Sequence, residues 1–299
     1  MNSSQIHTPL LKIVSDYTGV LLDAYGVFWG GNAIGMLPGA ENAMKHLVES
    51  GKIVGILSNA TRITDSEKEK LKKHGIFEGV HYHFLITSGQ IAREHALSGT
   101  MPFSTANNKY FVLGGPYTEI PIHKEIFADS VFEETDNINE ASFIYVSTPH
   151  LNGKDHTDAS VFDEIVRSYV PSKLPMLCAN PDSHAHEGNP PQAVVRQGSL
   201  ARKYQELNGE AHYIGKPYAP AFERAMREFM KFGVISPDKV VMIGDTPETD
   251  VKGSKSFGMG SVLITRTGIA SDRLKHNPNM IENLKDEEKP TFYLERFSI

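Results

Sequence analysis

Cysteine is almost absent from this chain: its 299 residues include only Cys178, so no internal disulfide can form. A chain without disulfides suits a reducing compartment, and we therefore expect a cytoplasmic protein. Long hydrophobic runs are missing too. No stretch approaches the roughly 18 apolar residues of a membrane-spanning helix, and residues 1–5 lack the basic and apolar regions that begin a signal peptide. The sequence therefore predicts no association with a membrane.

Positive charge is also in short supply, with 30 Lys and Arg residues against 36 Asp and Glu and a formal net charge of −6. A protein whose main partner is nucleic acid needs a basic face, so we expect no nucleic-acid partner. An acidic chain can still bind a small phosphate, because one metal ion and a few lysines set the local field. The length suits two domains of about 100–200 residues each.

Two apolar segments far apart in the chain each lead into an aspartate. Residues 20–22 precede Asp23, and residues 240–243 precede Gly244 and Asp245. Such near-continuous apolar runs are typical of strands buried on both faces of a parallel sheet, and open α/β sheets bind ligands at the carboxyl ends of such strands. Mg²⁺ prefers carboxylate and carbonyl oxygens and often meets substrate phosphate. The pattern therefore predicts a Mg²⁺ site and phosphoryl chemistry.

The order of the remaining elements predicts an α/β fold with a doubly wound parallel sheet. Core strands are expected at residues 19–24, 52–57, 240–243 and 262–265. The middle of the chain has its own expected strands at 110–113, 143–147 and 176–179 and a helix at 159–169. We therefore predict a core domain of residues 1–87 and 209–299, with a second α/β domain of residues 88–208 inserted into it. Residues 27–39 contain four glycines and predict a mobile loop over the strand ends.

Several polar residues at the predicted strand ends are candidates for a phosphate site. Asp23 is a candidate nucleophile, since an aspartate can accept a phosphoryl group, or it could cap a turn. Ser58 and Asn59 could hold phosphoryl oxygens or form an ordinary turn. Arg62 is a substrate contact or a solvated loop residue. Lys216, between a glycine and a proline, could bring its charge to phosphate or lie on the surface.

Together these motifs resemble those of the haloacid dehalogenase-like hydrolase superfamily. The matching segments are Asp23-x-Tyr25-Gly26-Val27, Ser58-Asn59, Lys216 and Gly244-Asp245-x-x-x-Thr249-Asp250. The long insertion after the second motif resembles the C2-type cap of this superfamily. Residues 178–182 and 215–217 resemble its NagD-type branch, which includes sugar and p-nitrophenyl phosphatases. The resemblance covers residues 19–269.

This resemblance implies a Mg²⁺-dependent phosphohydrolase that acts on a small phosphorylated metabolite through an aspartyl-phosphate. Asp23 would be the nucleophile, and Ser58 and Lys216 would bind the phosphoryl oxygens. The implied metal ligands are Asp23, the backbone carbonyl of Tyr25, and Asp245, with support from Thr249 and Asp250. The implied substrate contacts are Asn59, Arg62, Asn180 and Asp182. A homodimer is a further expectation from the resemblance.

The first motif departs from the family pattern at Tyr25. Phosphatases of this superfamily carry a second aspartate there, which protonates the leaving alkoxide. Acid–base help of this kind is worth about 10²–10⁴-fold, and a phenol with an ordinary pKa of about 10 is a poor base near neutrality. Three hypotheses follow: a phosphatase that uses another group or needs no proton donor, a phosphonate-type hydrolase, or a phospho-ligand-binding module with little turnover.

The histidines do not predict a metal site. His81 and His83 form one pair and His184 and His186 another, but no third ligand follows at metal-site spacing. Because His184 and His186 follow the predicted cap loop, they could line the cap side of the cleft. Cys178 ends a predicted strand and is expected to be a buried thiol.

The position of Tyr25 generates a test. Tyr25→Asp restores the missing carboxyl group and is expected to raise kcat/KM for alkyl phosphates by about 10-fold or more, since their leaving groups need a proton. Steady-state assays with Mg²⁺ measure this change. Unchanged or lower activity would contradict the role given to this position.

Overall fold

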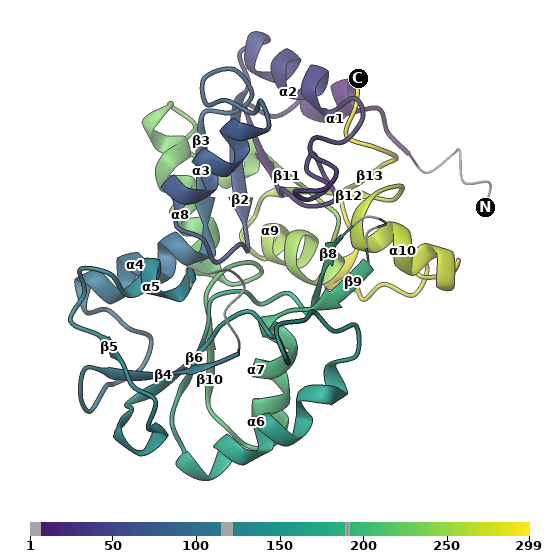
Figure 1. Ribbon diagram of the computed structural model, residues 1–299. Coiled ribbons are helices and arrows are strands. Elements are labelled where there is room, and N and C mark those ends of the chain that lie inside the picture. Colours follow the sequence, from purple (N-terminus) through teal and green to yellow (C-terminus); the bar gives the residue numbers. More distant parts are fainter. Residues whose placement is uncertain (1–6, 115–121, 189, 191) are drawn as a thin grey trace.

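The chain folds into two α/β units, each built on its own parallel sheet (Figure 1). The computed structural model describes residues 7–114, 122–188, 190 and 192–299. No helix among these residues has the length and apolar character needed to cross a membrane. The predicted α/β architecture is confirmed.

The first unit contains a six-stranded sheet in which every pair of neighbours is parallel, in the order β13-β12-β11-β1-β2-β3. Its strands are β1 (Gly19–Leu22), β2 (Ile53–Ser58), β3 (Phe84–Thr87), β11 (Val240–Gly244), β12 (Gly260–Ile264) and β13 (Phe292–Leu294). β1 lies between β11 and β2, with Leu22 opposite both Ile243 and Ile56. This register brings the ends of all three strands to one edge.

Helices cover both faces of this sheet, as the alternation of side chains along β1 requires. Val20 and Leu22 pack with α1, α2 and α3, whereas Leu21 packs with α4 and α8 on the opposite face. The helices of the chain are α1 (Leu10–Val14), α2 (Ala40–Glu49), α3 (Thr64–Lys73), α4 (Ser88–Ser98), α5 (Ile122–Phe127), α6 (Asp163–Tyr169), α7 (Gln197–Glu206), α8 (Ala219–Lys231), α9 (Lys252–Ser256) and α10 (Gly268–His276). Shorter helical turns are Ile138–Glu140, Ala159–Phe162, Val170–Ser172, Pro237–Lys239, Pro247–Val251 and Asp286–Glu288.

The second unit contains a five-stranded parallel sheet in the order β10-β7-β6-β4-β5 and a separate antiparallel hairpin, β8–β9. Its strands are β4 (Lys109–Leu113), β5 (Glu133–Glu134), β6 (Phe143–Val146), β7 (Met176–Cys178), β8 (His184–Glu187), β9 (Gln192–Val195) and β10 (Ala211–Tyr213). β10 pairs with β7, whereas the predicted boundary placed residues 209–299 in the core. We therefore propose that the cap extends to Tyr213 and the core resumes at Ile214.

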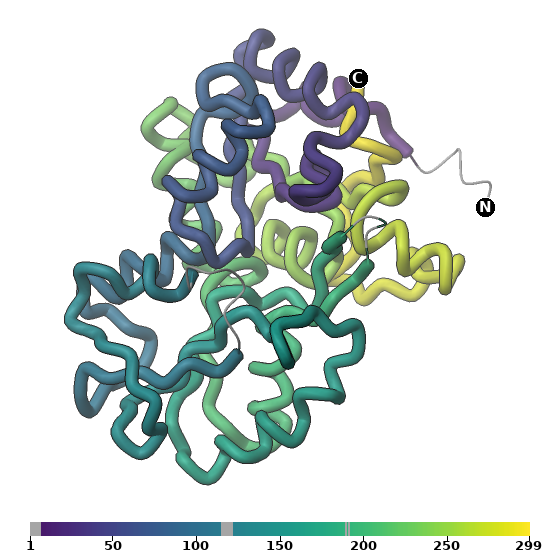
Figure 2. The backbone as a smooth tube through the Cα atoms, viewed as in Figure 1, coloured from purple at the N-terminus to yellow at the C-terminus, as the bar shows by residue number. Residues whose placement is uncertain are grey.

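The two units share buried contacts rather than a flexible tether. The chain passes to the second unit after α4 and returns after β10 (Figure 2). One apolar cluster contains Phe84 and Leu57 of the first unit together with Tyr110 and Phe143 of the second. Hairpin β8–β9 lies beside α10 of the first unit (Figure 1). The cap therefore packs on the core beside the carboxyl edge of the central strands.

Most expected strands form within a few residues of their predicted bounds, but β3 and hairpin β8–β9 were not predicted. β3 has only four residues, too short a run to separate from a loop by pattern alone. β8 contains two histidines and a glutamate, so it lacks an apolar face to recognise. Residues 27–39 form no helix or strand, as predicted, but Phe28 and Trp29 near the start of this loop are fully buried in a cluster with residues of α1, α2 and α3.

The aromatic packing beneath β3 generates a stability prediction. Phe229 is fully buried and meets Phe84 edge-on, with ring centroids 4.9 Å apart, whereas Phe232 stacks near the same ring but is 43% exposed. Phe229→Ala is expected to lower the free energy of unfolding by about 3–5 kcal/mol. The matched control Phe232→Ala should cost less than about 1 kcal/mol. Urea denaturation measures both, and equal losses would contradict this account of the core.

Candidate active site

The candidate site lies at the carboxyl edge of the six-stranded sheet. Asp23 directly follows β1, Ser58 is the last residue of β2, and Asp245 directly follows β11. All three are buried. Because the three strands are parallel neighbours, their ends converge at one edge, as the sequence predicted.

Lys216 provides the one buried ammonium of this edge among the residues that the structure describes. Its Nζ lies 2.5 Å from Asp23 Oδ1 and 2.8 Å from Asp250 Oδ1, and the residue is 1% exposed. Burial alone would lower the pKa of Lys216, but the carboxylates of Asp23 and Asp250 outweigh it and raise this pKa. The lysine is therefore a fixed positive charge beside the candidate nucleophile, not a surface residue in a turn.

Asn59 fixes this lysine through its backbone. Asn59 Oδ1 accepts from the backbone N–H of Lys216 at 2.8 Å, and Nδ2 donates to the Lys216 carbonyl at 3.1 Å and to Asp182 Oδ1 at 2.9 Å. Ser88 also donates to Asn59 Oδ1. The amide predicted to contact substrate is thus occupied by protein groups, and it joins β2, the cap loop and Lys216 in one network.

The turn after β11 is closed by Asp250. Its Oδ2 accepts from the backbone N–H groups of Asp245 at 3.1 Å and Thr246 at 3.0 Å. A Cβ on Gly244 would lie 2.2 Å from the Asp250 carboxyl carbon, so only glycine fits there. Asp250 therefore caps the turn with one oxygen and pairs with Lys216 through the other.

Asp245 accepts two hydrogen bonds, but its ionised form is still unfavourable. Thr246 Oγ1 donates to its Oδ1 at 2.8 Å, and the Ile269 N–H donates to its Oδ2 at 2.7 Å. Burial, with the nearby charge of Asp250 as the next cause, raises the pKa of Asp245 to about 7. Burial likewise raises the pKa of Asp23 well above its usual range. The site therefore gathers more negative charge than Lys216 balances.

This excess of buried negative charge fits a divalent cation. Asp23, Asp245 and Asp250 each offer a carboxylate oxygen, and these oxygens lie within 4.8 Å of one another. Asp23 Oδ2 and the Tyr25 carbonyl accept no hydrogen bond from the part of the chain that the structure describes. An all-oxygen set with unused acceptors is the kind that Mg²⁺ prefers.

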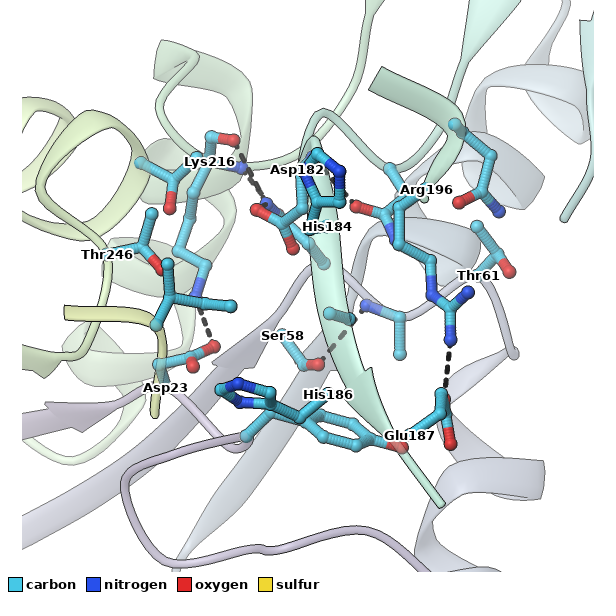
Figure 3. Close-up of a pocket in the computed structure, with 18 of the residues that line it drawn as sticks. Asp23, Ser58, Thr61, Asp182, His184, His186, Glu187, Arg196, Lys216 and Thr246 are labelled. Atoms are coloured by element: carbon cyan, nitrogen blue, oxygen red, sulfur yellow. Dashed lines mark hydrogen bonds and ion pairs between the residues drawn. The ribbon is translucent and has the colours of Figure 1, made fainter. Parts of the chain in front are cut away.

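A cavity of about 120 Å³ extends from this edge to the cap. Every residue predicted for the site lines it: Asp23, Tyr25, Ser58, Asn59, Arg62, Asn180, Asp182, Lys216, Asp245, Thr249 and Asp250. Figure 3 shows Asp23 and Lys216 on the core side, His184, His186 and Glu187 on β8 of the second unit, and Arg196, which lies between β9 and α7. The expectation that His184 and His186 line the cap side is confirmed.

Sequence reasoning missed several charged residues of the cavity wall. Arg196 is 5% exposed and donates to Glu187 at 2.7 Å and Asp155 at 3.1 Å. Lys70 pairs with buried Glu67 and lies 5.5 Å from the centre of the Tyr25 ring. No motif marks these residues. Only the spacing of Glu67 and Lys70, three residues apart on α3, hinted that they would meet.

Tyr25 keeps its proton in this setting. Burial raises the pKa of its phenol, with the charge of Lys70 acting in the opposite direction. A phenol with a raised pKa is no base near neutrality. The structure therefore agrees with the sequence that this side chain does not replace the missing carboxylate as a proton acceptor.

Cys178 takes no part in the site. It ends β7, is fully buried, and burial raises its thiol pKa to about 12. A thiol with such a pKa is not a nucleophile at neutral pH. The expectation of an inert buried thiol is confirmed.

Comparisons with known proteins agree with this geometry. Two family models match the chain: haloacid dehalogenase-like hydrolase over residues 20–125 and HAD-hydrolase-like over residues 213–298. Among curated proteins, chronophin of Mus musculus is 27% identical over 268 residues, which cover 88% of this chain and 85% of that protein. The segment between the two matched regions coincides with most of the five-stranded sheet.

Solved structures share the fold across nearly the whole chain. A haloacid dehalogenase-like hydrolase from Brucella suis superposes with a TM-score of 0.77 at 24% identity, covering 97% of this chain and 99% of that one. A 4-nitrophenylphosphatase from Thermotoga maritima superposes with a TM-score of 0.66 at 20% identity, covering 95% and 96%. At these identities the likeness shows a shared fold.

The raised pKa of Asp245 generates a prediction of pH dependence. A carboxyl whose pKa rises from 3.8 to about 7 on folding destabilises the ionised fold by up to about 4 kcal/mol. Its contribution to stability is present below about pH 4 and lost as the pH rises through about 7. Asp245→Asn keeps the shape: its amide oxygen can accept from the Ile269 N–H, and its NH₂ can donate to Thr246 Oγ1 in place of accepting from it. Without metal it should therefore raise the melting temperature at pH 8 and change it little at pH 4.

The same variant tests the metal site. Added Mg²⁺ should raise the melting temperature of the wild type at pH 8, because binding to the folded state alone stabilises it, and should leave Asp245→Asn unchanged. Melting curves with and without Mg²⁺ measure both effects. A variant less stable than the wild type at pH 8 without metal would contradict the charge crowding described here.

Proposed function

The chain belongs to the haloacid dehalogenase-like hydrolase superfamily, and from this premise we propose that it is a Mg²⁺-dependent phosphohydrolase acting on a small phosphorylated metabolite. The observation that carries the proposal is the placement of Asp23. Its carboxylate is buried at a sheet edge, touches the ammonium of Lys216 and faces a cavity shared with the cap. An aspartate held in this way is suited to attack phosphorus.

Each residue of the site has a separate role in the proposed phosphoryl transfer. Asp23 attacks the phosphorus and forms an aspartyl-phosphate, which water then hydrolyses to release inorganic phosphate. Lys216 and Ser58 hold the phosphoryl oxygens with donors fixed before the substrate arrives. Asp23, Asp245 and the Tyr25 carbonyl would hold Mg²⁺, with Asp250 behind them. When bound, Mg²⁺ supplies positive charge that neutralises the transferring phosphoryl group.

The size and lining of the cavity support a small, polar substrate. Its volume of about 120 Å³ leaves little room beyond a phosphate and a short carbon chain, and its cap wall includes Arg196, Glu187 and Gln197. The name of the structural neighbour 4-nitrophenylphosphatase, which states action on a phosphate ester, supports the phosphatase class. A cytoplasmic location and a homodimer remain predictions.

A phospho-ligand-binding protein with little turnover is the second candidate, and Tyr25 is the observation that favours it. The phenol occupies the position where related phosphatases carry their proton donor, and its raised pKa prevents it from acting as a base. The phosphonate-type alternative has less support. It calls for a lysine on the cap, and both lysines of the described cavity wall, Lys70 and Lys216, come from the core unit.

Hydrolysis of p-nitrophenyl phosphate with Mg²⁺ tests the proposal, because nitrophenolate leaves without a proton. Asp23→Asn is expected to lower kcat by more than about 10³-fold, since it removes the nucleophile. Asp238→Asn, an exposed aspartate on a distant helical turn, is the matched control and should behave as the wild type. Binding of beryllofluoride or vanadate without turnover of any phosphate ester would favour the second candidate.

A further inference from the structure

We propose that His186, positioned by Asp272, is the residue that protonates the leaving group. The inference rests on the proposed phosphohydrolase function and extends it to the step for which the sequence provides no residue. His186 lies on β8 of the cap hairpin and lines the same cavity as Asp23 and Tyr25. In Figure 3 it projects from its strand toward Asp23.

The imidazole of His186 is held by one nitrogen. Its Nε2 forms a short hydrogen bond with Asp272 Oδ2, and Asp272 lies on α10 of the core. Lys275 Nζ donates to the other oxygen of Asp272 at 2.7 Å, which fixes the carboxylate. A carboxylate on one ring nitrogen orients the imidazole and stabilises its protonated form.

The second nitrogen of His186 is free to act on a ligand. Among the residues that the structure describes, Nδ1 forms no hydrogen bond, and the side chain is 14% exposed within the cavity wall. An imidazole with one nitrogen held by a carboxylate and the other facing a substrate cavity is the arrangement expected of a general acid. The pair is also assembled from both units, because the histidine comes from the cap and the aspartate from the core.

Several other ionisable groups of the cavity are engaged elsewhere. Glu67 is paired with Lys70, Glu187 with Arg196, and Asp182 Oδ1 accepts from Asn59. Burial lowers the pKa of His184, so its ring is less readily protonated. These contacts leave His186 as the cavity residue with both a positioning carboxylate and an unengaged nitrogen.

The step conserves atoms and charge. Asp23 Oδ forms a bond to phosphorus as the bond between phosphorus and the ester oxygen breaks, and the Nδ1 proton of the His186 imidazolium passes to that oxygen. The products are the aspartyl-phosphate, a neutral alcohol and a neutral imidazole. Hydrolysis of the aspartyl-phosphate by water then releases phosphate and a proton, which restores the imidazolium.

The test compares two esters that differ in their need for a proton. His186→Asn is expected to lower kcat/KM for an alkyl ester, glycerol phosphate, by about 10²-fold or more, and to change it for p-nitrophenyl phosphate by less than about threefold. Asp272→Asn should lower the ratio of kcat/KM for glycerol phosphate to kcat/KM for p-nitrophenyl phosphate by about 10-fold. This variant leaves the acid in place but orients it less well. Because kcat/KM reports steps up to release of the first product, hydrolysis of the aspartyl-phosphate does not enter the comparison.

The matched control is His212→Asn. His212 lies on β10, outside the cavity, and its Nε2 lies 2.6 Å from Glu210 Oε1, so this variant should leave kcat/KM for both esters unchanged. Equal losses for both esters would mean that the pair merely fastens the cap, and would overturn the inference. So would an unchanged ratio, or a wild type that hydrolyses p-nitrophenyl phosphate but no alkyl ester. Failure of the wild type to hydrolyse either ester would instead overturn the proposed function, and this inference with it. Melting curves of each variant show whether it has folded.

Discussion

The ammonium of Lys216, held between Asp23 and Asp250 at the edge of the central sheet, is the interaction on which the rest of the site depends. A buried ammonium is stable only when carboxylates surround it, and buried carboxylates are stable only when a cation or hydrogen-bond donors compensate them. Here one lysine faces more carboxylates than it can neutralise. Burial, together with the charges of neighbouring carboxylates, raises the pKa values of Asp23 and Asp245, and the excess of negative charge suits a second cation.

The fold brings these charged residues together through the pairing of parallel strands. Parallel pairing of β11, β1 and β2 delivers Asp245, Asp23 and Ser58 to one edge, and glycines at positions 26, 244 and 268 leave space for the carboxylates beside them. Asn59 then joins the strand end to Lys216 and to Asp182 of the cap. The contacts of Asn59 therefore fix the backbone of Lys216 beside the nucleophile and also hold the loop that carries Asp182.

The cap contributes a side chain to the cavity as well as one of its walls. Its hairpin β8–β9 brings His186 into the cavity, and the pairing of this residue with Asp272 on α10 crosses from one unit to the other. Tyr25 leaves the core without a second carboxyl group in its first motif, so a proton for the leaving group has to come from elsewhere. A donor completed only when cap and core meet would link proton transfer to closure and protect the aspartyl-phosphate from an open site.

The local sequence pattern determined the central strands and the aspartates at their ends, because buried parallel strands leave continuous apolar runs and their ends carry polar residues. The same pattern predicted the position of Lys216 and the existence of an inserted α/β unit. It did not determine β3 or β8, whose short or polar sequences gain their structure from neighbouring strands. Nor did it place β10 in the second sheet, since strand pairing is decided by long-range contacts. The roles of Asn59, Lys70, Arg196 and His186 were decided only by tertiary structure, because each depends on a partner that is distant in the chain or on a cavity that folding creates.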